Sequence, residues 1–318
     1  MRGALVAVAL VASAGCGGSS IVRTAYEQTY LRADHNWSFR ESFPDADHLL
    51  NAFDYSHAIV YETLITHGGD TSRLENKEFG FITTKLLRHP PSVPLEEAAI
   101  GPDYATMVPE VVAMFDWAHM LHRQIYDVWS APGTDEWHDA ETRRVIAYYR
   151  SRRDLAFSAR PKSMALMEGQ SYSLAFRRLD PKFNGLLWSY HWFQMALYDA
   201  LIDGHTYPRR RALVDTVEAQ FFRMLGDAPR NMPSEMPMSP ASASTFSARY
   251  PDAAIIFDNL HSLHDVVSDI LVSPVVPKAA KRSAILAAAA AYRDDTTAVI
   301  SHDEWRGMSL MMAPKIPR

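Results

Sequence analysis

The chain has 318 residues, 47% of them hydrophobic, so it is long enough to bury a sizeable core in one large domain. Its formal net charge is −5, and basic clusters such as residues 209–211 are short and isolated. Without a basic surplus to neutralise a phosphate backbone, the composition argues against nucleic acid as a partner.

The first twenty residues have the features of a targeting segment. Arg2 supplies a positive start, residues 4–12 form an apolar stretch too short to span a bilayer, and small residues follow. Ser13-Ala14-Gly15-Cys16 then resembles the lipobox of bacterial lipoproteins, with Ser13 where that family usually has leucine. The expected organisation is a signal peptide at residues 1–15, a lipidated tether and lead-in at 16–40, and a single helical domain at 41–318.

Cys16 is the only cysteine of the chain, and it stands where a lipobox requires a thiol for the lipid. The resemblance implies an exported lipoprotein whose only link to the membrane is this anchor. In a Gram-negative cell the expected site is the periplasmic side of the outer membrane, because Gly17 replaces the aspartate that often signals inner-membrane retention. The alternative is ordinary secretory cleavage after Ala14, which leaves Cys16 as a free thiol.

Beyond the tether, apolar residues recur at three- and four-residue spacings, and long alternating stretches of strand type are missing. We therefore predict an all-α fold. The expected helices, in chain order, cover about residues 45–67, 109–129, 135–152, 162–178, 185–202, 209–225, 252–272 and 277–292. The proline-containing stretches between them are expected to be loops, at residues 89–94, 131–133, 179–181 and 231–240.

Two of the expected helices carry the same motif. Residues 115–122 follow the pattern F-D-x-x-H-x-L-H and are followed by Asp127, and residues 257–264 follow the same pattern and are followed by Asp269. A repeated motif of this kind indicates that both helices present the same polar side chains to the same surroundings.

Two further helices share part of this motif. Residues 53–57 keep F-D-x-x-H, and Glu62 follows them one to two turns later. The fourth helix keeps His191 and the distal Asp199 but has Trp188 in place of the first aspartate. Four core helices are thus expected to share one Asp-x-x-His register, with peripheral helices around them.

On a helix, the first aspartate, the first histidine and the distal aspartate of this motif lie within about 80° of one another. Large apolar residues flank these polar stripes, so the stripes should face the interior or a cleft. Inward carboxylates and imidazoles are the groups with which helical bundles hold metal ions. The arrangement resembles ferritin-like di-iron bundles in architecture, although Asp-x-x-His replaces their Glu-x-x-His.

The sequence predicts a mononuclear or dinuclear centre, with iron as the first candidate and manganese or zinc next. The expected metal ligands are Asp54, His57, Asp116, His119, His191, Asp258 and His261. The residues expected as reserve ligands or as supports behind them are Glu62, His122, Asp127, Asp199, His264, Asp265 and Asp269. Haem b and a metal-free Asp/His hydrogen-bond network are the alternatives, and the absence of C-x-x-C-H excludes covalent c-type haem.

No motif in the sequence identifies the reaction that the protein would catalyse. Redox-active iron or manganese would act on oxygen or peroxide, whereas zinc would activate water for hydrolysis. Two other classes of function fit the same pattern: a lipoprotein that stores or delivers metal, and a non-catalytic subunit of an envelope complex whose Asp-His pairs fix helix register. Serine hydrolase, Walker and Rossmann patterns are missing from the chain.

Overall fold

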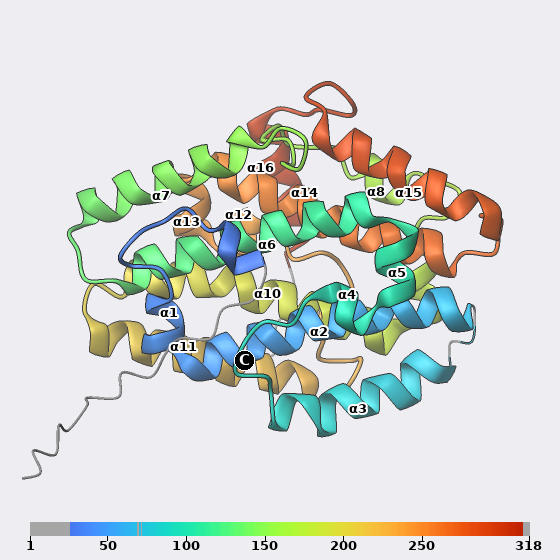
Figure 1. The fold of residues 1–318 in the computed structure, drawn as a ribbon, viewed down its shortest axis with the longest axis horizontal. Helices are drawn as coiled ribbons and strands as arrows, with labels where there is room; N and C mark the ends of the chain where they lie inside the picture. The colour runs from blue at the N-terminus through green and yellow to red at the C-terminus, as the bar shows by residue number, and fades with distance from the viewer. Residues whose placement is uncertain (1–25, 69, 71, 314–318) are drawn as a thin grey trace, which may run out of the picture.

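The computed structural model describes residues 26–68, 70 and 72–313, and within them the fold is all-α, as predicted (Figure 1). The β-structure of these residues is limited to one isolated bridge between Lys162 and Val299. The signal peptide and Cys16 lie outside the described residues. None of the described helices is both long enough and apolar enough to cross a membrane.

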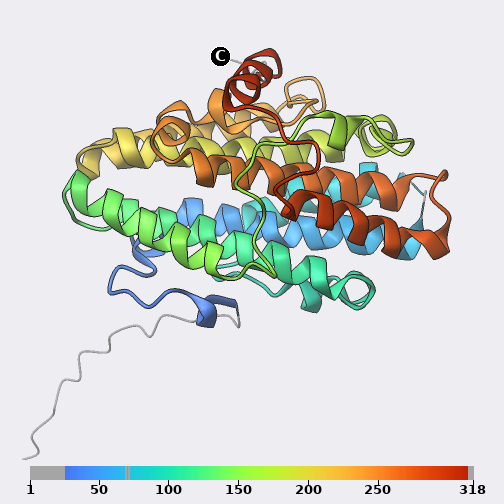
Figure 2. The same ribbon diagram turned by 90° about the horizontal axis from the view of Figure 1, so that it is seen from above.

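Four long helices form the centre of the bundle (Figures 1 and 2). They are α2 (Pro44–His67), α6 (Pro109–Ser130), α10 (Pro181–Asp203) and α14 (Pro251–Val272). Both α2 and α6 pack against α10 and α14, so the four helices enclose a common core. Helix α14 is buried on every side, because each residue from Ala253 to Val272 is shielded from solvent.

Outer helices cover each central helix. Helix α7 (Asp135–Ser151) packs against α6, α11 (Tyr207–Leu225) against α10, and α15 (Lys278–Arg293) against α14. The π-helical segment η2 (Arg73–Glu78) and the short helices α4 (Glu97–Ile100) and α5 (Pro102–Met107) pack against α2. The remaining elements are η1 (Tyr26–Thr29), α1 (Ser38–Ser42), α3 (Phe79–Thr84), η3 (Leu86–Arg88), α8 (Ala165–Glu168), α9 (Ala175–Leu179), α12 (Ser239–Ser242), α13 (Ser244–Arg249) and α16 (His302–Met311).

The central helices all begin in the same way. Each starts with a proline, whose fixed φ suits the first helical position, and each follows a short helix: α1, α5, α9 or α13. The residue before each proline is excluded from the helical region and takes one conformation throughout, with φ between −139° and −128° and ψ between 58° and 63°. The chain therefore contains four copies of a unit made of a short helix, a bend and a long helix.

A carboxylate lies eighteen residues after each of these prolines and joins the units in pairs. Each accepts two backbone N–H hydrogen bonds of 2.7–3.1 Å at the start of a short helix: Asp127 at α1, Glu62 at α5, Asp269 at α9 and Asp199 at α13. A negative charge stabilises the free N–H groups of a helix start. Since the first and second units exchange carboxylates, as do the third and fourth, the bundle consists of two reciprocal pairs.

Several sequence-based boundaries need correction. The helix expected at residues 162–178 is interrupted between α8 and α9, because Leu174 takes a left-handed conformation (φ 62°) and Asp269 binds the N–H groups of Leu174 and Phe176. Pro181 starts α10, although a loop is expected there. The expected domain boundary at residue 41 falls inside α1, where Phe39 is buried in the core.

Candidate metal centre

Six buried histidines meet between the four central helices. Helix α2 contributes one, α6 two, α10 one and α14 two, and each is between 0% and 4% exposed. This histidine cluster consists of His57, His119, His122, His191, His261 and His264. The shared proline start explains the recurrence, because the tenth and thirteenth residues after it lie on the inward face of every unit.

The proline register places α2 differently from the motif-based alignment. Counted from Pro44, Asp54 occupies the position that His119 has in α6, and His57 occupies that of His122. The F-D-x-x-H motif of α2 is therefore displaced by one helical turn relative to that of α6. This displacement brings His57 toward His264 on α14, where the two ring centroids are 4.2 Å apart.

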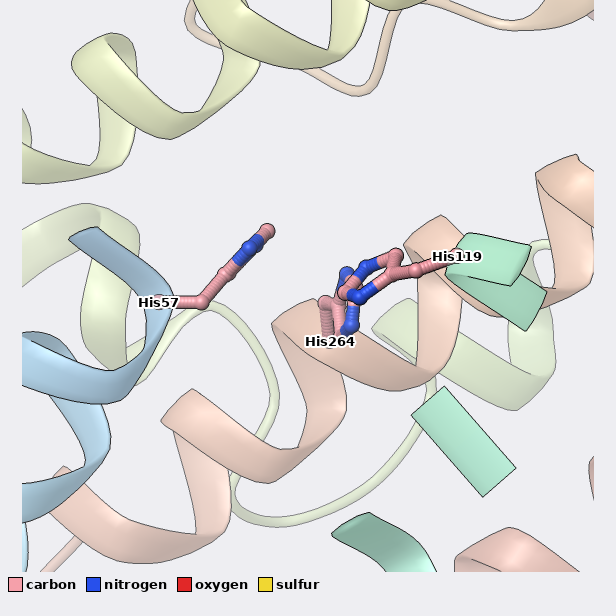
Figure 3. Close-up of side chains that lie close together, drawn as sticks. All are labelled: His57, His119 and His264. Atoms are coloured by element: carbon pink, nitrogen blue, oxygen red, sulfur yellow. The ribbon is translucent and has the colours of Figure 1, made fainter. Parts of the chain in front are cut away.

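Three of the imidazoles point toward one another (Figure 3). His57, His119 and His264 each offer a ring nitrogen, and these nitrogens lie within 4.8 Å of one another. Three separate helices supply them, so the bundle has to be assembled before the group exists. A spacing of this order fits a single ion coordinated by all three rings after small side-chain adjustments.

Two carboxylates extend this group on the side of His119. Glu97 and Asp116 each offer an oxygen within 4.8 Å of a ligand atom of His119, and Glu97 Oε1 lies 4.0 Å from His119 Nδ1. Glu97 is 2% exposed, and both of its oxygens lack a hydrogen-bond partner within the described part of the chain. The two groups share His119 and together form the mixed-donor centre: His57, His119, His264, Glu97 and Asp116.

Burial sets the protonation states in this centre. It lowers the pKa of His57 well below the ordinary value, and neighbouring histidines lower it further; the pKa of His119 and that of His264 are lowered too, again chiefly by burial. These imidazoles are therefore neutral at pH 7 and keep a lone pair for a metal. Burial raises the pKa of Glu97 well above its usual range and that of Asp116 to about 7, and nearby carboxylates add to both shifts.

Many polar atoms of the histidine cluster have no partner among the described residues. They are both ring nitrogens of His57 and of His261, Nε2 of His119, His122 and His264, and Nδ1 of His191. A buried polar atom without a hydrogen bond costs roughly 1–3 kcal/mol, and folded proteins contain few of them. Together with nearby carboxylates, imidazoles with such nitrogens form groups that could hold a metal ion.

The other side of the cluster is partly hydrogen-bonded. His191 Nε2 lies 3.3 Å from His264 Nδ1, and His122 Nδ1 lies 2.6 Å from the hydroxyl of Tyr198. Asp265 faces His191 and His264 across a cavity of about 10 Å³, and its Oδ2 has no partner within the described residues. A cavity of this size holds about one water molecule or ion.

Two of the expected metal ligands, Asp54 and Asp258, bind other side chains. Asp54 pairs with Arg123 at 2.7 Å, and its other oxygen stays 3.9 Å from His119 Nδ1, at the edge of the centre. Asp258 accepts hydrogen bonds from the backbone N–H and hydroxyl of Ser239 (2.8 and 2.7 Å) and from the indole of Trp305 (2.7 Å). Both oxygens of Asp258 are occupied, so this residue anchors α12 and α16 to α14 and has no free oxygen for a metal.

The distal carboxylates also have another role. Glu62, Asp127, Asp199 and Asp269 bind the starts of the short helices, as described above, and hold the paired units together. Their regular spacing is a real repeat in the sequence, but these carboxylates hold the bundle together and do not belong to the mixed-donor centre.

Sequence reasoning missed Glu97. It lies in α4, outside the repeated units, and adjoins Glu96 without any motif that marks it. Gly101 explains how α4 comes close to α2, because a Cβ atom there would lie only 3.3 Å from the carbonyl oxygen of Ala58 and 3.5 Å from Glu62 Oε2. Such a contact between distant segments leaves no local signal in the sequence.

Comparison of this chain with protein family models, with curated proteins and with solved structures found no match.

Proposed function

We propose that this protein is an exported, lipid-anchored metalloprotein that binds a metal ion in the mixed-donor centre. The proposal rests on the buried, neutral imidazoles that gather beside Glu97 and Asp116. Within the described residues, several of their ring nitrogens have no hydrogen-bond partner, and neither carboxylate pairs with a lysine or arginine. Burying this many ionisable groups is costly unless they coordinate an ion.

These nitrogen and oxygen donors favour a metal ion of intermediate softness. Three imidazole nitrogens and two carboxylate oxygens suit iron, manganese or zinc, and two ionised carboxylates would balance a divalent charge. We infer iron first, then manganese or zinc. The cavity beside His191 and His264 is about 10 Å³, which favours an ion over haem b as the occupant of this region.

The burial of the centre limits what can reach it. Glu97 and the three imidazoles are at most 4% exposed and Asp116 is partly buried, so we infer a reactant as small as dioxygen or peroxide. A bound iron or manganese ion would supply electron exchange with such a molecule. Storage or delivery of the metal without turnover is the second candidate, because the same enclosure also suits retention of an ion.

Elemental analysis of the full-length protein, purified without a histidine tag, tests the proposal. We expect about one equivalent of iron, manganese or zinc in the wild type and its loss in a His57→Gln, His264→Gln double variant. The matched control is a His67→Gln, His205→Gln variant, which removes two exposed imidazoles and should keep the metal. A metal-free wild type that unfolds cooperatively, or a double variant that keeps its metal, contradicts the proposal. Peroxide consumption by the loaded wild type separates a redox function from storage.

The lipid anchor is tested separately. Wild-type protein expressed in a Gram-negative host should fractionate with membranes and incorporate labelled palmitate. A Cys16→Ser variant should lose the label and leave the membrane fraction, because the thiol that receives the lipid is gone. Equal fractionation of both proteins argues for ordinary secretion and against the anchor.

A further inference from the structure

A surface cleft of about 740 Å³ shares no residue with the mixed-donor centre. It is formed by the end of α7, the segment that follows it, and the end of α15. Its lining consists of Ala147, Arg150, Ser151, Arg153, Ala156, Phe157, Ser158, Ala159, Arg293 and Asp295. This volume falls in the range of sites that bind small molecules.

The cleft is positively charged in a protein whose net charge is −5. Three arginines and one aspartate line it, and the aspartate, Asp295, accepts a hydrogen bond of 2.6 Å from the hydroxyl of Ser158. Concave surfaces lined by one sign of charge concentrate ligands of the opposite sign.

Two of the arginines retain donors for a ligand. The guanidinium of Arg153 makes no hydrogen bond or ion pair within the described residues. Arg293 donates from Nη2 to the carbonyl oxygen of Arg153 (2.8 Å), while its Nη1 makes no hydrogen bond or ion pair with the residues described. Arg150 is different, because it already forms an exposed ion pair with Asp252 at 2.5 Å.

One wall of the cleft is apolar. Ala147 on α7 is exposed there, whereas Ala156 and Phe157, which also line the cleft, are almost fully buried. The backbone N–H of Phe157 donates to the hydroxyl of Tyr149 (2.9 Å), which fixes this segment against α7. An apolar wall beside charged donors suits a ligand that has both an anionic and an apolar part.

We propose that this cleft binds a small organic anion, whose carboxylate or phosphate oxygens are held by Arg153 and Arg293 and whose apolar part lies against Ala147 on α7. Guanidinium groups bind such oxygens in a planar, two-point geometry. The site is separate from the mixed-donor centre, because none of the five residues of that centre lines the cleft.

Calorimetric titration of the full-length protein tests this site, with phenyl phosphate, benzoate and inorganic phosphate as probes. We expect phenyl phosphate or benzoate to bind more tightly than inorganic phosphate, because only the aryl probes contact the apolar wall at Ala147. Tighter binding of phenyl phosphate assigns the cleft to phosphate esters, and tighter binding of benzoate assigns it to carboxylates.

Two variants with matched controls locate the site. Arg153→Gln should weaken binding roughly tenfold, because it removes a charge-assisted hydrogen bond to the anion. Ala147→Glu should abolish binding by placing a carboxylate in the wall. Arg230→Gln and Ala287→Glu make the same changes at exposed positions outside the cleft and should have no effect. The proposal is overturned if no probe binds, or if the cleft variants and their controls weaken binding equally.

Discussion

Replacement of His57 by leucine should stabilise the metal-free protein and remove its response to metal. Both ring nitrogens of His57 are buried without a partner among the described residues, and the side chain is 0% exposed. Each such atom costs roughly 1–3 kcal/mol, so an apolar side chain of similar size should raise the free energy of unfolding by about 2 kcal/mol. In the wild type, a metal ion at a hundred times its dissociation constant should add about 2.7 kcal/mol.

Urea unfolding, followed by circular dichroism with chelator and with added metal, measures both effects. A His138→Leu variant is the control, because His138 is equally buried but its Nε2 bonds the carbonyl oxygen of Ala131 at 3.0 Å. This variant should lose stability and keep its response to metal. If His57→Leu destabilises the metal-free protein by 1 kcal/mol or more and metal still stabilises it, His57 belongs to a satisfied network and the reasoning fails.

Three further predictions concern pH and architecture. Metal affinity should fall roughly a hundredfold per pH unit below about pH 7, because Asp116, with its pKa near 7, and the protonated Glu97 must each release a proton on binding; titrations at several pH values should show a slope of only about tenfold per pH unit for Asp116→Asn. Burial lowers the pKa of His261 to about 3, so its contribution to stability is present above pH 6.5 and is lost as the pH falls toward 3. Urea unfolding of the metal-free protein should therefore depend less on pH in that window for His261→Leu than for the wild type. Asp269→Ala should lower the free energy of unfolding by roughly 2–3 kcal/mol through loss of two backbone hydrogen bonds, and a similar loss in the exposed control Asp45→Ala would refute this role.

The sequence by itself determined the fold class and the four central helices. Apolar spacing is a local property, so the expected ranges 109–129 and 252–272 each differ by one residue from α6 and α14. The repeated histidines also indicated which helix faces turn inward. Short elements such as α9 were not predictable, because Asp269, distant in sequence, holds its start in place.

Only the tertiary structure decided which inward side chains can bind a metal. Asp116 and Asp258 hold the same position in the same motif, but Asp258 meets Ser239 and Trp305, whereas Asp116 meets Glu97 and His119. The helical period determines the direction of a side chain. Whether its oxygens stay free for a metal depends on which distant segment packs against it. Such long-range contacts produce no periodic pattern in the sequence.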